Sequence, residues 1–302
     1  MKRAYRRVGV VVGLWLVLAS TAWAEGEPPT MADVEQWGTL IELDEAQLYI
    51  PHAAVADDAG QIDVIVHFHG GLTYLAREIE RYGFNAVLIY YSPGGLSSAY
   101  RVPFEDPRKF GRLLDEALGA LREQDRWAEE VEWGELVVTS FSAGYGAVRE
   151  LLKSPGYVEE IDGVLLCDSL YAGYAPGSVE GDPVERRVNM QQMRPFVEFA
   201  QRAAAGEKRF TFAHTYIVPP GYAGTHETAD YLAEALGVEW RATDLEGPGG
   251  MHRDRVAGKA GFSLVGATGD DAIAHVLHLR EAGYFLDQMG LFGKVFSHES
   301  ED

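Results

Sequence analysis

The sequence has little cysteine and few basic residues. Cys167 is the only cysteine among 302 residues, so no disulfide can form within the chain. Lysine and arginine number 26 against 46 aspartates and glutamates, which gives a formal net charge of −20 at pH 7. Such a chain lacks the basic surface that nucleic-acid phosphates and anionic membranes attract. We therefore expect no nucleic-acid partner and no stable membrane anchoring of the mature protein.

A long apolar run occurs only near the N-terminus, at residues 8–18. It follows four basic residues and precedes Ala22-Trp23-Ala24, which fits a signal-peptidase site, and it is too short for an ordinary membrane span. We predict that residues 1–24 are a signal peptide and that the mature protein begins at Glu25. Export to the periplasm or the medium follows, and cleavage changes the formal charge from −20 to −24.

The remaining sequence, residues 25–302, shows no repeat or low-complexity tract and predicts a single domain. Apolar strand patterns alternate with helical ones after an antiparallel start. This order predicts an α/β fold with a doubly wound, mostly parallel sheet of about eight strands, whose sites form at the strands' carboxyl ends. Strands are expected at 37–43, 47–50, 62–68, 84–91, 136–141, 164–167, 210–218 and 262–267, and helices at 72–81, 106–124, 142–153, 189–205, 227–236 and 271–289.

One strand, residues 136–141, stops abruptly at small residues before a helical pattern. The sequence Ser140-Phe141-Ser142-Ala143-Gly144 is close to the G-x-S-x-G nucleophile elbow, with Ser142 as the nucleophile. The elbow requires small residues two positions before and after the nucleophile, because the strand and helix backbones pass close together there. The alternative is an ordinary strand-to-helix turn with Ser142 as the helix N-cap.

A second strand ends in His67-Phe68-His69-Gly70-Gly71. Backbone N–H groups in such a turn can face a developing oxyanion, and the N–H of Ala143 would add a second donor. The competing interpretation is a metal pair, because alternate residues His67 and His69 share a face of a strand. No third ligand follows within a few residues, as a metal site requires. A third possibility is a glycine turn without a function.

The sequence downstream of Ser142 contains candidates for an acid and a base. Asp168 ends a short apolar strand, where it can orient a histidine, although aspartate also forms turns there. Its rival Glu227 lies within a helical pattern. His275 lies near the start of the last helix and is preferred over His278, which lies nearly one turn deeper. The order Ser142, Asp168, His275 is the order nucleophile, acid, base.

These motifs resemble the α/β-hydrolase family over most of the mature chain. The resemblance implies a Ser-His-Asp triad, no cofactor, and an oxyanion turn shaped by His69 with donors at Gly71 and Ala143. Two features depart from the family pattern: Ser140 replaces the first glycine of the elbow, and Asp168 follows the sixth strand, whereas the family more often carries the acid after the seventh.

The expected function is that of an exported serine hydrolase, a carboxylesterase acting on a small-molecule ester, less readily an amide, through an acyl-enzyme. Residues 169–193 occupy the position of a lid-like insertion, and tyrosines within it are candidates for a pocket lining. Two other classes stay open. One is a metal-dependent hydrolase that uses His67 and His69, and the other is a non-catalytic binding protein on the same fold.

Overall fold

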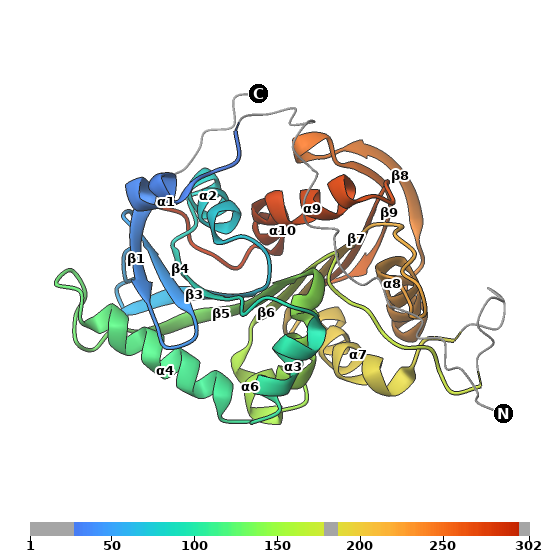
Figure 1. The fold of residues 1–302 in the computed structure, drawn as a ribbon, viewed down its shortest axis with the longest axis horizontal. Helices are drawn as coiled ribbons and strands as arrows, with labels where there is room; N and C mark the ends of the chain where they lie inside the picture. The colour runs from blue at the N-terminus through green and yellow to red at the C-terminus, as the bar shows by residue number, and fades with distance from the viewer. Residues whose placement is uncertain (1–26, 178–186, 296–302) are drawn as a thin grey trace, which may run out of the picture.

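A computed structural model describes residues 27–177 and 187–295 (Figure 1). The predicted signal peptide, residues 1–24, and part of the lid-like insertion lie outside the described residues, so both assignments stay predictions. Within the described ranges, no helix is both long and apolar enough to cross a membrane.

The architecture is built on one ten-stranded sheet with the order β1-β2-β4-β3-β5-β6-β7-β10-β9-β8. The strands are β1 (Gly38–Glu42), β2 (Gln47–Pro51), β3 (Gln61–Phe68), β4 (Ala86–Tyr91), β5 (Glu132–Phe141), β6 (Gly163–Cys167), β7 (Arg209–His214), β8 (Arg241–Glu246), β9 (His252–Lys259) and β10 (Phe262–Ala267). Strands β4, β3, β5, β6, β7 and β10 form the parallel centre, and the strands beyond them pair antiparallel.

The predicted α/β class with a doubly wound, mostly parallel sheet is confirmed, but the sheet has more strands than the eight expected. The additional strands are β8 and β9, which extend the edge beyond β10 as an antiparallel hairpin. Their sequences lack an apolar run because β8 is mostly exposed and β9 is mostly half-buried. Hydrophobic periodicity therefore gives little signal for them, and only the glycines at 247, 249 and 250 mark the turn between them.

Helices cover both faces of the sheet, as Figure 1 shows. Helices α1 (Met31–Trp37), α2 (Leu72–Tyr82), α9 (Ala272–Arg280) and α10 (Ala282–Met289) lie on one face. On the other face lie α3 (Ser97–Phe104), α4 (Lys109–Arg122), α5 (Tyr145–Leu151), α6 (Pro155–Glu160), α7 (Met190–Ala204) and α8 (Thr225–Leu236). The prediction of a single last helix at 271–289 is wrong, because this segment is divided at Glu281 into α9 and α10. Short helices α1, α3 and α6 were not expected, since each is too brief to show a periodic pattern.

Two hydrophobic cores, one on each face, hold the helices to the sheet. Along β3, Val64 and Val66 belong to one core and Ile65 to the other. Strands covered on both faces read as continuous apolar runs, which is why the central strands were recognisable. Cys167 at the end of β6 is fully buried in the second core.

Candidate active site

The expected elbow lies where β5 runs into a short 3-10 turn, η1 (Ser142–Gly144), and then α5. Ser142 has φ 49°, in the left-handed region that non-glycine residues seldom adopt and that recurs at functional sites. A Cβ on Gly144 would lie 2.1 Å from the carbonyl oxygen of Phe68, so only glycine permits this close packing of the turn against β3. The sharp turn leaves Ser142 half-buried at the carboxyl edge of the sheet.

Asp168 directly follows β6 and is completely buried. Its carboxylate accepts hydrogen bonds from the Thr215 backbone N–H (2.9 Å) and hydroxyl (2.8 Å), and from the Thr225 hydroxyl and His275 Nδ1 (2.5 Å each). Burial raises the pKa of this carboxyl, but the hydrogen bonds from His275 and Thr225, together with nearby histidine charge, outweigh burial. The pKa of Asp168 therefore lies well below its usual value, and the group is a carboxylate at neutral pH.

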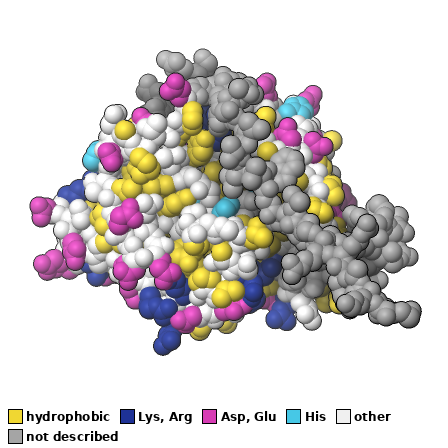
Figure 2. Space-filling view, viewed as in Figure 1, with side chains coloured by type: hydrophobic (Ala, Val, Ile, Leu, Met, Phe, Trp, Pro, Cys, Tyr) yellow, Lys and Arg dark blue, Asp and Glu magenta, His cyan; other side chains and the backbone are white. Residues whose placement is uncertain are grey.

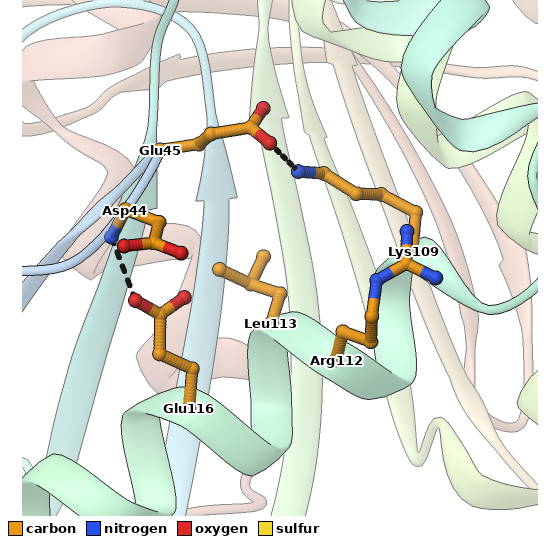
Figure 3. Close-up of a pocket in the computed structure, with 6 residues that line it drawn as sticks. All are labelled: Asp44, Glu45, Lys109, Arg112, Leu113 and Glu116. Atoms are coloured by element: carbon orange, nitrogen blue, oxygen red, sulfur yellow. Dashed lines mark hydrogen bonds and ion pairs between the residues drawn. The ribbon is translucent and has the colours of Figure 1, made fainter.

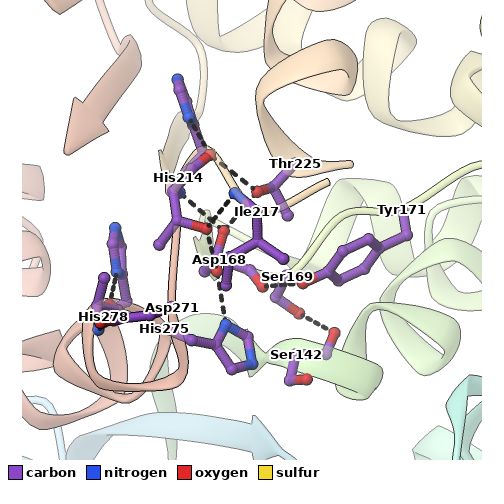
Figure 4. A network of polar contacts seen from close by, with 12 residues as sticks. Ser142, Asp168, Ser169, Tyr171, His214, Ile217, Thr225, Asp271, His275 and His278 are labelled. Carbon is purple, nitrogen blue, oxygen red and sulfur yellow. Dashed lines mark hydrogen bonds and ion pairs between the residues drawn. The ribbon is translucent and has the colours of Figure 1, made fainter. Parts of the chain in front are cut away.

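His275 lies in the first turn of α9, whose N-cap is Asp271. In the neutral form of a ring whose Nδ1 donates to Asp168, the other ring nitrogen, Nε2, has a free lone pair. Figure 4 shows this side of the ring turned toward Ser142. The ring packs against Phe141, with centroids 4.4 Å apart, and its side chain is 19% exposed. The three residues predicted from sequence are thus gathered at one edge of the sheet.

The rival acid and base have other partners. His278 is buried, donates from Nδ1 to the carbonyl of Ala274 (2.9 Å) and stacks on Phe285. Glu227 caps its own helix by accepting from the N–H of Gly224 (2.8 Å) and from the Tyr174 hydroxyl. Neither replaces Asp168 or His275 in the cluster around Ser142.

The two histidines of the β3 turn each have hydrogen-bond partners. His67 Nε2 contacts the carbonyl of His69 (2.5 Å), so it carries the proton, and Nδ1 accepts from the Thr139 hydroxyl (2.7 Å). Burial lowers the pKa of His67 to about 3. His69 has φ 70°, which turns it off the strand, and its Nδ1 lies 2.6 Å from the Tyr100 hydroxyl. Among the described residues, no group of three or more side chains is placed to hold a metal ion.

The expected oxyanion donors lie at two neighbouring helix starts. Phe68 of β3 is paired with Ser140 of β5, which brings the two strand ends side by side. Three residues on, Gly71 is the N-cap of α2, and Ala143 lies in η1. Helix N-termini present backbone N–H groups and a partial positive charge, which suits a developing anion.

Several residues of the cluster were not expected from the sequence. Thr215 lies within the strand expected at 210–218, but β7 ends at His214, which places Thr215 beside Asp168 at the end of the neighbouring strand. In the sequence, the one indication of this role was that Thr215 is a polar residue directly after a run of buried residues. Tyr100 lies in helix α3, which was not expected, and Ser169 belongs to no recognised sequence motif.

The described part of the segment after β6 contributes aromatic side chains beside the elbow. Tyr171 lies 5.6 Å from Tyr145 and 5.8 Å from Tyr222, measured between ring centroids. Arg149 of α5 donates to the carbonyl of Tyr171 (2.6 Å) and so fastens this segment to the helix that follows the Ser142 turn. The predicted lid-like insertion is therefore tied down at its first residues, and residues 178–186 lie outside the described ranges.

A surface pocket of about 250 Å³ lies away from the elbow, between the β1–β2 turn and α4 (Figure 3). Two contacts join the turn to the helix there: Lys109 pairs with Glu45, and Glu116 accepts from the backbone N–H of Asp44 (2.6 Å). We interpret this pocket as the place where the β1–β2 turn is held against α4.

Figure 2 shows hydrophobic side chains in patches on one face, with acidic side chains around them.

The mostly parallel sheet thus has a serine in a left-handed turn at the end of β5, with an aspartate–histidine pair beside it. A scan against models of known protein families and a search of curated proteins found no match. Among solved structures, the chain is similar to an S-formylglutathione hydrolase from Agrobacterium tumefaciens, with 14% identity, TM-score 0.41, and coverage of 84% of this chain and 94% of that one.

Two further similar structures are a siderophore hydrolase, EstA, from Aspergillus nidulans and a monoglyceride lipase from Saccharomyces cerevisiae. The first has 12% identity and TM-score 0.45, covering 83% of this chain and 94% of that one. The second has 11% identity and TM-score 0.40, covering 88% of this chain and 97% of that one.

Proposed function

We propose that this protein is an exported serine hydrolase that cleaves carboxylic esters through an acyl-enzyme. One observation carries the proposal: the serine at a strained turn faces a histidine whose other nitrogen is bonded to a buried carboxylate. Ser142, His275 and Asp168 supply these three groups. This arrangement has the roles of a nucleophile, a base and an orienting acid.

The reaction would proceed in two steps. His275 Nε2 removes the proton of the Ser142 hydroxyl while the oxygen attacks the ester carbonyl carbon. The N–H groups of Gly71 and Ala143 stabilise the oxyanion, and the protonated imidazole gives its proton to the leaving alcohol. A water molecule then gives a proton to His275 and attacks the acyl-enzyme carbonyl. As the bond between the acyl carbon and Ser142 Oγ breaks, His275 returns that proton to Ser142 Oγ and the acid is released.

The remaining groups orient this machinery. Asp168 holds the imidazole in the tautomer with its proton on Nδ1 and stabilises the imidazolium that forms. Thr215 and Thr225 hold the carboxylate in place. His69 packs on Phe141, whose ring also contacts His275, and so supports both the oxyanion turn and the base. Burial lowers the pKa of His69 to about 4, so it is neutral at working pH and acts by packing and hydrogen bonding.

The proposed substrate is a small, uncharged or weakly charged ester with an apolar or aromatic acyl group. The tyrosines at 145, 171 and 222 support this class because aromatic faces bind apolar groups. The formal charge of −20 disfavours polyanionic substrates. We further propose that the substrate is met in the periplasm or medium, on the strength of the leader sequence at residues 1–24.

The proposal is tested with p-nitrophenyl acetate and butyrate and with a fluorophosphonate probe. The wild-type protein should turn over both esters and take up one label on Ser142, located by peptide mapping. Ser142→Ala should abolish both while its circular dichroism is unchanged, because loss of one half-buried hydroxyl costs little stability. Ser98→Ala, an exposed serine on α3, is the matched control and should behave as wild type.

Three results would contradict the proposal. Full activity in folded Ser142→Ala, or a label on another serine, would remove Ser142 as nucleophile. Activity that is abolished by a chelator and resists fluorophosphonate would favour the metal-dependent alternative with His67 and His69. A wild-type protein that neither hydrolyses nor takes up label, yet binds ester analogues, would favour the non-catalytic binding protein.

A further inference from the structure

A chain of buried hydroxyl groups leads from the strand before the nucleophile to the nucleophile's own peptide. Ser140 Oγ lies 2.8 Å from Ser169 Oγ, and the Ser169 hydroxyl donates to the carbonyl oxygen of Ser142 at 2.9 Å. Ser140 and Ser169 are both completely buried. Figure 4 shows the contact between Ser169 and Ser142 beside the Asp168 cluster.

The direction of this chain follows from the proton count. A hydroxyl has one proton, and the proton of Ser169 is used on the Ser142 carbonyl, which can only accept. The hydrogen bond between the two hydroxyls must therefore be donated by Ser140. This gives a reason for a serine at the elbow position where the resembling family has glycine: its hydroxyl supplies a donor in a site without water access.

The Ser142 carbonyl belongs to the same peptide plane as the N–H of Ala143. The peptide is trans, so its carbonyl and N–H point in opposite directions. A hydrogen bond that holds the carbonyl toward Ser169 therefore aims the Ala143 N–H away from Ser169. Accepting that bond also polarises the amide and strengthens its N–H as a donor.

We propose that Ser169 is a positioning residue for the oxyanion hole, acting through the Ser142–Ala143 peptide. The inference rests on the proposed serine-hydrolase function. Ser169 directly follows Asp168, so one turn after β6 holds both the acid that orients His275 and the peptide that carries the oxyanion donor. The hydrogen bond from Ser169 also helps to hold Ser142 at its φ of 49°. Such a conformation persists only where several surrounding contacts fix it.

A purely structural role for Ser169 predicts a different pattern of losses. A buried hydroxyl that only stabilised the fold would leave turnover per folded molecule unchanged. An oxyanion-hole role lowers kcat and leaves KM for the ester unchanged, because the oxyanion exists only in the transition state. It also weakens a boronic acid inhibitor, whose tetrahedral adduct with a serine places an oxygen in the oxyanion hole.

The test compares Ser169→Ala, Ser140→Ala and a matched control with p-nitrophenyl butyrate and phenylboronic acid. Loss of a direct oxyanion donor costs about 10² to 10³ in kcat. An indirect one should cost less, so Ser169→Ala should lower kcat about tenfold. KM should stay within about twofold, and the Ki of the boronate should rise about as much as kcat falls. Ser140→Ala keeps the Ser169 donor and should lose about threefold.

The matched control is Thr228→Val, which removes another buried hydroxyl that lies within hydrogen-bond distance of two backbone carbonyls, those of Leu170 (2.8 Å) and Thr225 (2.9 Å). It should lose stability and keep kcat. If Ser169→Ala does not fold, Ser169→Cys preserves the volume with a weak donor and should show the same drop in kcat. Thermal melting and circular dichroism establish the folded fraction of each variant.

The outcomes separate the two proposals. One outcome is that the wild-type protein turns over ester and is labelled on Ser142 while Ser169→Ala has the same kcat and the same boronate Ki. That result overturns the role of Ser169 and leaves the proposed function standing. A rise in KM at unchanged kcat overturns that role too. A wild-type protein without turnover or label overturns the proposed function and this inference with it.

Discussion

Replacement of Glu78 should make the protein more stable at alkaline pH. Glu78 of α2 is completely buried against Glu281, the residue between α9 and α10, and the two carboxyls share Arg81. Arg77 lies 3.1 Å from Glu78 and also donates to the carbonyl of Arg280. One oxygen of Glu78, Oε2, is buried without a hydrogen-bond partner. Glu78→Gln keeps the shape of the side chain and removes its titration.

The magnitude follows from the pKa of Glu78. Burial, with a smaller contribution from the charge of Glu281, raises this pKa from 4.5 to about 7, despite the two arginines. At about 1.4 kcal/mol for each pKa unit, ionising Glu78 costs about 3 kcal/mol of folding stability. Because the folded pKa is the higher one, this stability is present below about pH 4.5 and is lost as the pH rises through about 7.

The assay is guanidinium unfolding at pH 5 and pH 8 on wild type, Glu78→Gln and Glu234→Gln, an exposed glutamate of α8. Glu78→Gln should gain about 2 to 3 kcal/mol over wild type between pH 5 and pH 8, with an unchanged denaturant slope. The Glu234 variant should follow the wild-type profile. If Glu78→Gln also follows it, Glu78 is already ionised at pH 5 in the folded protein, and the argument from burial is refuted.

Three further predictions concern the triad, the elbow and the leader. Asp168→Asn should lower kcat about 10⁴-fold, the size of this change in the serine-protease triad, whereas His278→Ala should stay active; the reverse order in ester turnover would reassign both. Ser140→Val should destabilise the fold by about 1 to 3 kcal/mol through crowding, and Ser140→Gly should remain folded and active, as melting curves and ester assays would show. N-terminal sequencing of exported protein should begin at Glu25, and an intact leader would contradict the cleavage prediction.

The sequence by itself determined the fold class and the place of the sharp turn at Ser142. Both rest on local physical requirements. Strands covered on two faces need unbroken apolar runs, and a sharp strand-to-helix turn needs small residues around Ser142. Gly144 illustrates the second requirement, because the carbonyl of Phe68 leaves no room for a side chain there. Such constraints are written in neighbouring residues and are legible without coordinates.

Tertiary structure decided which polar residues meet Ser142. Asp168 and His275 are 107 positions apart, and His275 was distinguishable from His278 only by depth in a helix. Strand β8, which is mostly exposed, and strand β9, which is mostly half-buried, carry no apolar pattern, so the sheet's full width also appeared only in the structure. Thr215, Thr225 and Ser169 join the site through hydrogen bonds between segments far apart in sequence. Those contacts depend on how strand ends are placed side by side, and no local pattern encodes that placement.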